Sequence, residues 1–157
     1  MRTVDQILIR APVDRVLQVA SEVERWPEIL AHYRWVRVLE RRDGGGTVEM
    51  AAWRPFGPLR YPTWWVSEMT IDRPAGEIRY RHVRGITRGM EVVWRLDEDV
   101  GDGGSSRGVN VEIVHTWDGP NWPLIGKVAA NLMIGPIFIQ GIASRTLAGI
   151  KRATEIK

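Results

Sequence analysis

The sequence contains no cysteine. This absence excludes a thiol nucleophile, a disulfide framework and any metal site built from thiolates. Residues 1–16 include Asp5, Arg10 and Asp14, which leave no apolar stretch long enough for a signal peptide. We therefore expect no secretion signal and a cytoplasmic location. The three histidines are scattered without the spacing of metal ligands, so we expect neither a metal nor another cofactor.

A strong excess of one charge is also missing. Lys and Arg number 22 and Asp and Glu number 19, which gives a net charge of +3. Opposite charges are interspersed, as in residues 34–42, whereas nucleic-acid-binding proteins gather basic residues on one face. We expect no nucleic-acid partner. A chain of 157 residues with 44% hydrophobic residues is typical of one globular domain, which we place at residues 1–157.

Tryptophan is abundant, with eight copies against three Tyr and two Phe. Small cores rarely contain so many indoles, because each buried N–H needs a hydrogen-bond partner. One interpretation is that several of these rings line a pocket for a flat or long apolar ligand. The other interpretation is that they simply fill the core.

The hydropathy pattern predicts one strand, two short helices, six strands and a long C-terminal helix. The strands form an antiparallel meander that curls around the apolar stripe of the last helix, which makes the fold class α+β. We expect strands at 3–10, 33–39, 47–54, 60–72, 77–83, 90–96 and 109–117. We expect helices at 12–20, at 22–32 with Ser21 as its cap and an interruption near its start at Trp26-Pro27, and from 121 to 157 with a break at 135–136.

Together with this order of elements, several short motifs resemble the START-like helix-grip (SRPBCC) superfamily: Trp26-Pro27-Glu28, Tyr33, Trp65-Val66-Ser67-Glu68 and Met90-x-x-Val93-Trp94. The chain is most similar to polyketide aromatase/cyclases and polyketide cyclase/dehydrase-like proteins, over residues 3–155. The resemblance implies a helix-grip fold, in which a curved seven-stranded antiparallel sheet wraps a long C-terminal helix and two short helices follow the first strand. It also implies a deep apolar pocket that holds a poly-β-keto chain and guides its cyclisation.

The resemblance further implies roles for individual residues. Tyr33 and Ser67 would be catalytic groups that hydrogen-bond substrate carbonyls, and three indoles would shape the pocket: Trp26, Trp65 and Trp94. The sequence departs from the aromatase pattern at Met69, where that pattern has an Arg, and on the last helix, where the expected Asn is missing. Met cannot supply the charge-assisted donor that Arg supplies.

Strand parity adds further ligand-binding candidates. Met69, Tyr80, His82 and Trp117 lie on the inner phase of their strands, and we expect them to contact the ligand. His115 has the same phase as Trp117. A buried histidine can act as a general acid or base, or it can be an ordinary core residue with satisfied hydrogen bonds.

Arg54 has two interpretations. It shares the phase of apolar residues on its strand, so its guanidinium could bind an oxyanion or carboxylate in a dry cavity. Its place at the end of the strand beside Pro55 favours the other interpretation, in which the side chain extends into water.

These observations support two function hypotheses. In the first, the protein binds a hydrophobic small molecule, polyketide-like or aromatic, in an internal cavity and promotes its cyclisation or dehydration. In the second, it is a non-catalytic carrier or chaperone for a lipid or isoprenoid quinone, similar to coenzyme-Q-binding START-type proteins. The second hypothesis draws on Met69 and on the 20-residue segment 124–143, in which Lys127 alone is charged. That segment could be a buried lid, a patch for transient membrane or protein contact, or a membrane span.

Overall fold

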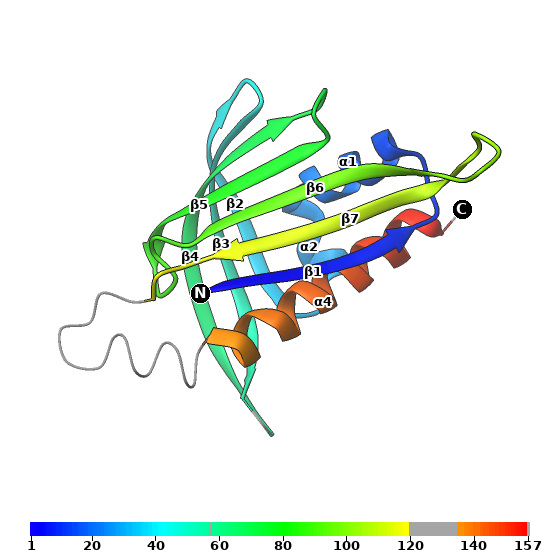
Figure 1. Cartoon of the computed structure of the whole chain (residues 1–157). Helices are drawn as coiled ribbons and strands as arrows, with labels where there is room; N and C mark the ends of the chain where they lie inside the picture. Colours follow the sequence, from blue (N-terminus) through cyan, green and yellow to red (C-terminus); the bar gives the residue numbers. More distant parts are fainter. Residues whose placement is uncertain (57, 120–134, 157) are drawn as a thin grey trace.

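The computed structural model describes residues 1–56, 58–119 and 135–156 (Figure 1). The elements follow the predicted order, and the α+β prediction is confirmed. They are β1 (Arg2–Ile9), α1 (Val13–Ser21), the 3₁₀ helix η1 (Val23–Arg25), α2 (Trp26–Ile29), β2 (Tyr33–Arg42), β3 (Gly45–Phe56), β4 (Leu59–Asp72), β5 (Glu77–Gly85), β6 (Glu91–Val100), β7 (Ser106–Thr116) and α4 (Gly135–Glu155).

The strands form one antiparallel sheet in the order β1-β7-β6-β5-β4-β3-β2. The first strand pairs with the last, Arg2 opposite Thr116 and Ile9 opposite Val109, which closes the meander at that edge. Figure 1 shows the sheet curving over α4, with α1 and α2 beside the helix. The space between sheet and helix is where the core, and any internal cavity, must lie.

Period-two alternation explains which strand faces are buried. On β5, Ile78 and Tyr80 are buried while Arg79 and Arg81 are exposed. The apolar stripe of α4 meets this face as predicted, and its described members are buried: Ile142, Ala143, Thr146, Leu147 and Ile150.

A β-bulge adjusts the pairing of β5 with β4. Trp65 lies opposite Gly85, but Ser67 lies opposite His82, so β5 holds one extra residue, Val83, in this interval. Gly85 has a φ of +95°, and a Cβ there would overlap the carbonyl oxygen of Trp64. Glycine is therefore required at this position. The bulge brings His82 onto the face that Trp65 occupies.

The second helix is shorter than predicted. The chain forms η1 and then α2, which begins at the predicted interruption with Pro27 in its first turn but ends at Ile29 and not at residue 32. Pro27 has no N–H to donate and cannot continue a helix from the residues before it, so a new helix begins there. Ser21 is not a cap, because it ends α1 and its hydroxyl donates to the Gln18 carbonyl at 3.1 Å.

Residues 124–134 of the apolar segment 124–143 are outside the described residues. Residues 135–143 form the beginning of α4. In the described part of the chain, no helix has the length and hydropathy needed to cross a membrane.

Candidate ligand-binding site

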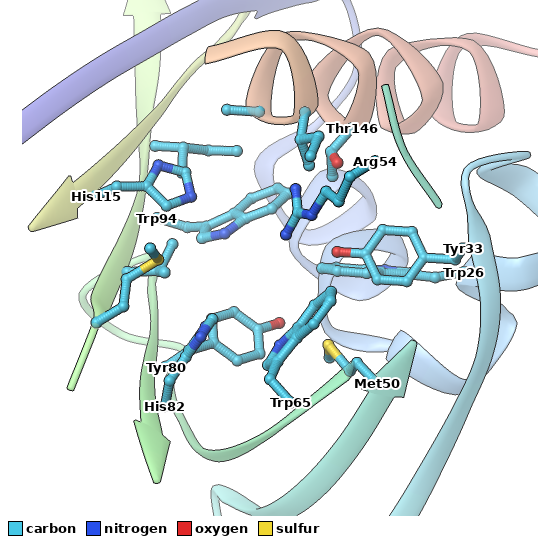
Figure 2. Close-up of a pocket in the computed structure, with 15 residues that line it drawn as sticks. Trp26, Tyr33, Met50, Arg54, Trp65, Tyr80, His82, Trp94, His115 and Thr146 are labelled. Atoms are coloured by element: carbon cyan, nitrogen blue, oxygen red, sulfur yellow. The ribbon is translucent and has the colours of Figure 1, made fainter. Parts of the chain in front are cut away.

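A small internal cavity lies between the sheet and α4, and Figure 2 shows the side chains around it. Its volume is about 60 Å³, well below the roughly 150 Å³ of a protein cavity that takes up benzene. Strands β2 to β7, helix α2 and helix α4 all contribute to its lining. A ring system can enter a cavity of this size only if side chains move.

Aromatic rings form the walls of the cavity. The ring of Trp26 meets Tyr33 edge-on, with centroids 5.1 Å apart, and lies 5.8 Å from the ring of Trp94. Trp65 stacks on His82, with centroids 5.7 Å apart and an angle of 10° between the planes. The structure thus brings together three indoles that the sequence analysis placed inside. Their part in ligand binding stays a prediction.

Arg54 is buried in this cavity, and the interpretation that placed it in water was wrong. Its side chain is 7% exposed, and its guanidinium lies 5.2 Å from the centroid of the Trp65 ring. The Nε of Arg54 donates to the Oγ1 of Thr63 at 3.3 Å. The error arose because β3 does not end at Arg54 but continues to Phe56, and Arg54 pairs with Tyr61 of β4.

Burial lowers the pKa of Arg54 to about 10, despite the opposing influence of Tyr33 and Tyr61. The guanidinium therefore remains cationic at neutral pH. A cation in an apolar cavity loses hydration, which costs free energy unless other groups stabilise it. Here an indole face and a hydroxyl do so in part.

Tyr33 and Thr146 place two hydroxyls beside Arg54. Burial raises the pKa of Tyr33 to about 12, against the effects of Arg54 and of a hydrogen bond with Thr146. The Tyr33 hydroxyl therefore stays protonated and can donate a hydrogen bond. Thr146 also bonds His32, with 3.0 Å between its Oγ1 and the Nε2 of the ring. Thr146 was not predicted as a polar group of the site, although its hydroxyl stands alone within the apolar stripe of the last helix.

The two inward histidines are neutral at physiological pH. Burial lowers the pKa of His82 to about 3, with smaller contributions from His115 and Arg54. Burial and the charge of Arg54 lower the pKa of His115 to about 4. His82 Nδ1 lies 2.6 Å from the Oγ1 of Thr87. An imidazole with so low a pKa is a weak general base, so these rings offer hydrogen-bonding atoms more than proton transfer.

Several polar atoms in the cavity wall have no hydrogen-bond partner within the described part of the chain. They are Trp26 Nε1, Tyr80 Oη and His115 Nδ1. Most buried polar atoms in proteins are satisfied, so a cluster of three around one cavity requires an explanation. Figure 2 shows the hydroxyls of Tyr33 and Tyr80 directed into the space that the Arg54 guanidinium also faces. This arrangement suits a ligand that carries oxygen acceptors.

Ser67, Met69 and Trp117 are not among the described residues that line the cavity. Ser67 is fully buried within the sheet face, Met69 lies at a separate hollow near the end of α1, and Trp117 donates from Nε1 to the Arg88 carbonyl at 3.1 Å. Ser67 lies opposite His82 and Met69 lies opposite Tyr80 on the neighbouring strand, so both are next to lining residues without lining the cavity themselves. Their part in ligand binding stays a prediction. Strand parity gives the face of a side chain, but not its position along a long, twisted strand.

Three more of the described tryptophans, Trp35, Trp53 and Trp64, are not among the residues that line the cavity. Trp64 is on the outer face and donates from Nε1 to Glu49 at 2.8 Å. Trp53 and Trp35 each lie near a guanidinium, of Arg34 at 4.8 Å and of Arg37 at 4.7 Å. Trp122 is outside the described residues.

Metal-binding side chains do not gather in the described ranges: no three His, Asp or Glu residues there come together as a metal site. The cavity lining in the same ranges offers two imidazoles, His82 and His115, and no carboxylate.

Comparison with known proteins gives a consistent family. Residues 9–136 match the family described as polyketide cyclase / dehydrase and lipid transport. A protein of Streptomyces cyaneus named "Putative polyketide cyclase" is 35% identical over 98 residues, which are 61% of this chain and 62% of that protein. A protein of the same name from Streptomyces halstedii is 32% identical over 98 residues, covering 61% of this chain and 87% of the relative. The match thus spans less than two thirds of the first relative.

Solved structures share the fold at low sequence identity. The Zhui aromatase/cyclase of Streptomyces sp. R1128 superimposes with a TM-score of 0.82 at 16% identity, covering 99% of this chain and 93% of that one. TTHA0849 of Thermus thermophilus gives 0.80 at 19% identity, with 98% and 97% covered. The major latex-like protein 151 of Panax ginseng gives 0.72 at 13%, with 99% and 98% covered. These similarities confirm the predicted helix-grip fold.

Proposed function

The chain belongs to the polyketide cyclase/dehydrase and lipid transport family, and we propose that it binds a polyketide-like or aromatic molecule in its internal cavity and promotes cyclisation and dehydration of that molecule. The observation that carries the proposal is the composition of the cavity wall. Indole rings provide flat apolar surfaces, while hydroxyls and a guanidinium provide donors directed inward. Ligand sites combine these features, because apolar walls give affinity and a few polar groups fix orientation.

The cavity can favour cyclisation in two ways. Stacking a flexible chain against Trp26, Trp65 and Trp94 holds its reacting carbons close together, which removes much of the entropic barrier to ring closure. The protonated Tyr33 hydroxyl can donate a hydrogen bond to the carbonyl oxygen under attack, where negative charge develops. The attacking methylene, which lies between two carbonyls, loses its proton to water as the bond forms; loss of water from the resulting alcohol and enolisation of the remaining ketones then give the aromatic ring.

This chain has Met69 where the aromatase pattern has an Arg, and Arg54 supplies the missing cationic donor from another position. It does so from β3, whereas Met69 is on β4. The guanidinium and the Tyr33 hydroxyl face the same space (Figure 2). Two donors of this strength favour an oxygenated substrate over an alkyl chain, and so they count against a carrier of a plain alkyl lipid.

The proposal is tested with a synthetic linear tetraketone, which also cyclises slowly in buffer. We expect the protein to change the ratio of cyclised products measured by chromatography. Tyr33→Phe removes only the donor hydroxyl and should reduce the effect by about tenfold to a hundredfold. Thr70→Val is the control that removes a hydroxyl elsewhere, because Thr70 is exposed on β4 and is not among the described residues that line the cavity. The same product ratio with and without protein would refute the proposed activity.

A further inference from the structure

The cavity has an unusual charge for an apolar site. Arg54 is the only formally charged side chain among the described residues that line it, and it is 7% exposed. The imidazoles of His82 and His115 are neutral near pH 7, and the phenols of Tyr33 and Tyr80 are protonated. The described lining therefore carries one positive charge in surroundings made mostly of aromatic rings.

The positive charge acts across the whole cavity. Burial is the main cause of the lowered pKa values of three histidines, and the charge of Arg54 lowers all three further. They come from different parts of the chain: His32 just before β2, His82 on β5 and His115 on β7. It also favours ionisation of Tyr33. An anion placed anywhere in this space is stabilised by the same field.

The guanidinium is held in a fixed orientation. The bond from Arg54 Nε to Thr63 at 3.3 Å fixes one edge, and Thr63 itself donates to the Ala52 carbonyl at 3.1 Å. The ring of Trp65, 5.2 Å away, supports one face. A planar guanidinium fixed in this way matches the planar fork of a carboxylate.

A second observation, independent of Arg54, also indicates an oxygen-bearing ligand. Trp26 Nε1 can only donate, and it has no acceptor within the described residues although Trp26 is 2% exposed. The hydroxyl of Tyr80, which is 5% exposed, likewise lacks a partner there. Figure 2 shows Tyr80 Oη directed towards the space between Arg54 and Trp65. Both atoms can be satisfied by ligand oxygens.

We propose that the cavity takes an aromatic carboxylate as its ligand, with the carboxylate paired to Arg54 and the ring between the indoles of Trp26 and Trp65. This inference rests on the proposed function and specifies the substrate class within it: a polyketide-derived ring or chain that ends in a carboxylic acid. A carboxylate brings the opposite charge to a buried cation and accepts from several donors at once, whereas a ketone oxygen is neutral.

The test compares two ligands of the same shape by isothermal titration calorimetry, 2-naphthoate and its neutral analogue 2-naphthamide. Because the two molecules have the same size, the free energy needed to open the small cavity is the same for both and cancels. We expect the carboxylate to bind about tenfold to a hundredfold more tightly. In Arg54→Met this preference should disappear while the amide still binds. Arg54→Lys should retain much of the preference, because it keeps the charge.

Arg34→Met is the matched control. Arg34 also lies near an indole, that of Trp53, but on the exposed surface, so its loss should leave the preference intact. Near-UV circular dichroism checks that each variant is folded. If the wild-type protein binds both ligands equally, or prefers the amide, the carboxylate inference is wrong while the proposed function stands. If it binds neither ligand, the inference is wrong and the proposed aromatic pocket fails with it. If Arg34→Met abolishes the preference, the charge acts from the surface and the assignment to Arg54 is wrong.

Discussion

Replacing Arg54 with Met is expected to stabilise the unliganded protein. Burial lowers the pKa of Arg54 to about 10, which means that the folded state holds this cation less favourably than the unfolded chain does. The sign follows directly: the destabilisation is fully present at neutral pH, below the folded pKa, and fades only as the pH rises above it. Met has a similar length and no charge, so it removes the penalty and keeps the packing.

The magnitude can be worked from the pKa. A fall of about 2.5 pKa units, at 1.36 kcal/mol per unit, corresponds to roughly 3 kcal/mol. The variant loses the hydrogen bond to Thr63, worth about 1 kcal/mol, and the contact with the Trp65 ring. The expected net gain in unfolding free energy is thus about 1–2 kcal/mol, or roughly 2–8 °C in the melting temperature of a chain of this size.

Thermal and urea unfolding at pH 7, in the absence of ligand, measure this gain. Arg34→Met serves again as the surface control and should change the unfolding free energy by less than about 0.5 kcal/mol. A fall of about 1 kcal/mol or more for Arg54→Met would show that the guanidinium holds the fold together, and the reasoning that it is kept for a ligand would have to be abandoned.

Three further predictions concern the cavity wall and the β-bulge at Gly85. Trp65→Ala should abolish binding of 2-naphthoate, whereas Trp64→Ala on the outer face should leave it nearly unchanged; equal losses in calorimetry would contradict the placement of the two rings. Burial lowers the pKa of His82 to about 3 and of His115 to about 4. As the pH falls below about 6.5, these histidines take up protons in the unfolded chain but not in the folded protein, so the unfolding free energy should drop between about pH 6.5 and 4. His115→Phe should reduce that drop by about 2 kcal/mol in urea unfolding at about pH 4.5, and an unchanged drop would count against a neutral buried ring. Gly85→Ala should lower the unfolding free energy by about 2–4 kcal/mol, because its φ of +95° and the nearby carbonyl oxygen both exclude a Cβ; a melting temperature equal to that of the wild type would refute this.

The fold could be predicted from the sequence because its strands alternate cleanly. The alternation of apolar residues such as Ile78 and Tyr80 with charged residues such as Arg81 indicates which face of the strand is buried. Short connections between the strands then leave few possible topologies for an antiparallel sheet. The interruption at Trp26-Pro27 could be predicted from the proline, but the end of the helix could not, because α2 stops at Ile29 and not at residue 32.

The candidate site was predicted less completely, since a cavity depends on positions along strands as well as on their faces. Trp26, Tyr33, Trp65 and Trp94 line one cavity, whereas Ser67 and Met69, on the same face of β4 as Trp65, are not in its described lining. That these residues bind a ligand stays a prediction. The burial of a charged residue such as Arg54 depends on where its strand ends, which sequence patterns locate poorly. Thr146 looked like one more member of an apolar stripe until its neighbours were known.

The bulge at Val83 has a consequence for how this protein can change by deletion. Arg84 already lies opposite Val66 and His82 opposite Ser67, so loss of Val83 would leave a regular ladder in which His82 keeps its inward face. Strand β6 has no such spare residue, because its pairing with β7 is uninterrupted from Glu91 to Asp99. Loss of one residue there would exchange the inner and outer faces of part of the strand and expose apolar side chains. Related chains are therefore expected to differ by one residue in the length of β5 more readily than in that of β6.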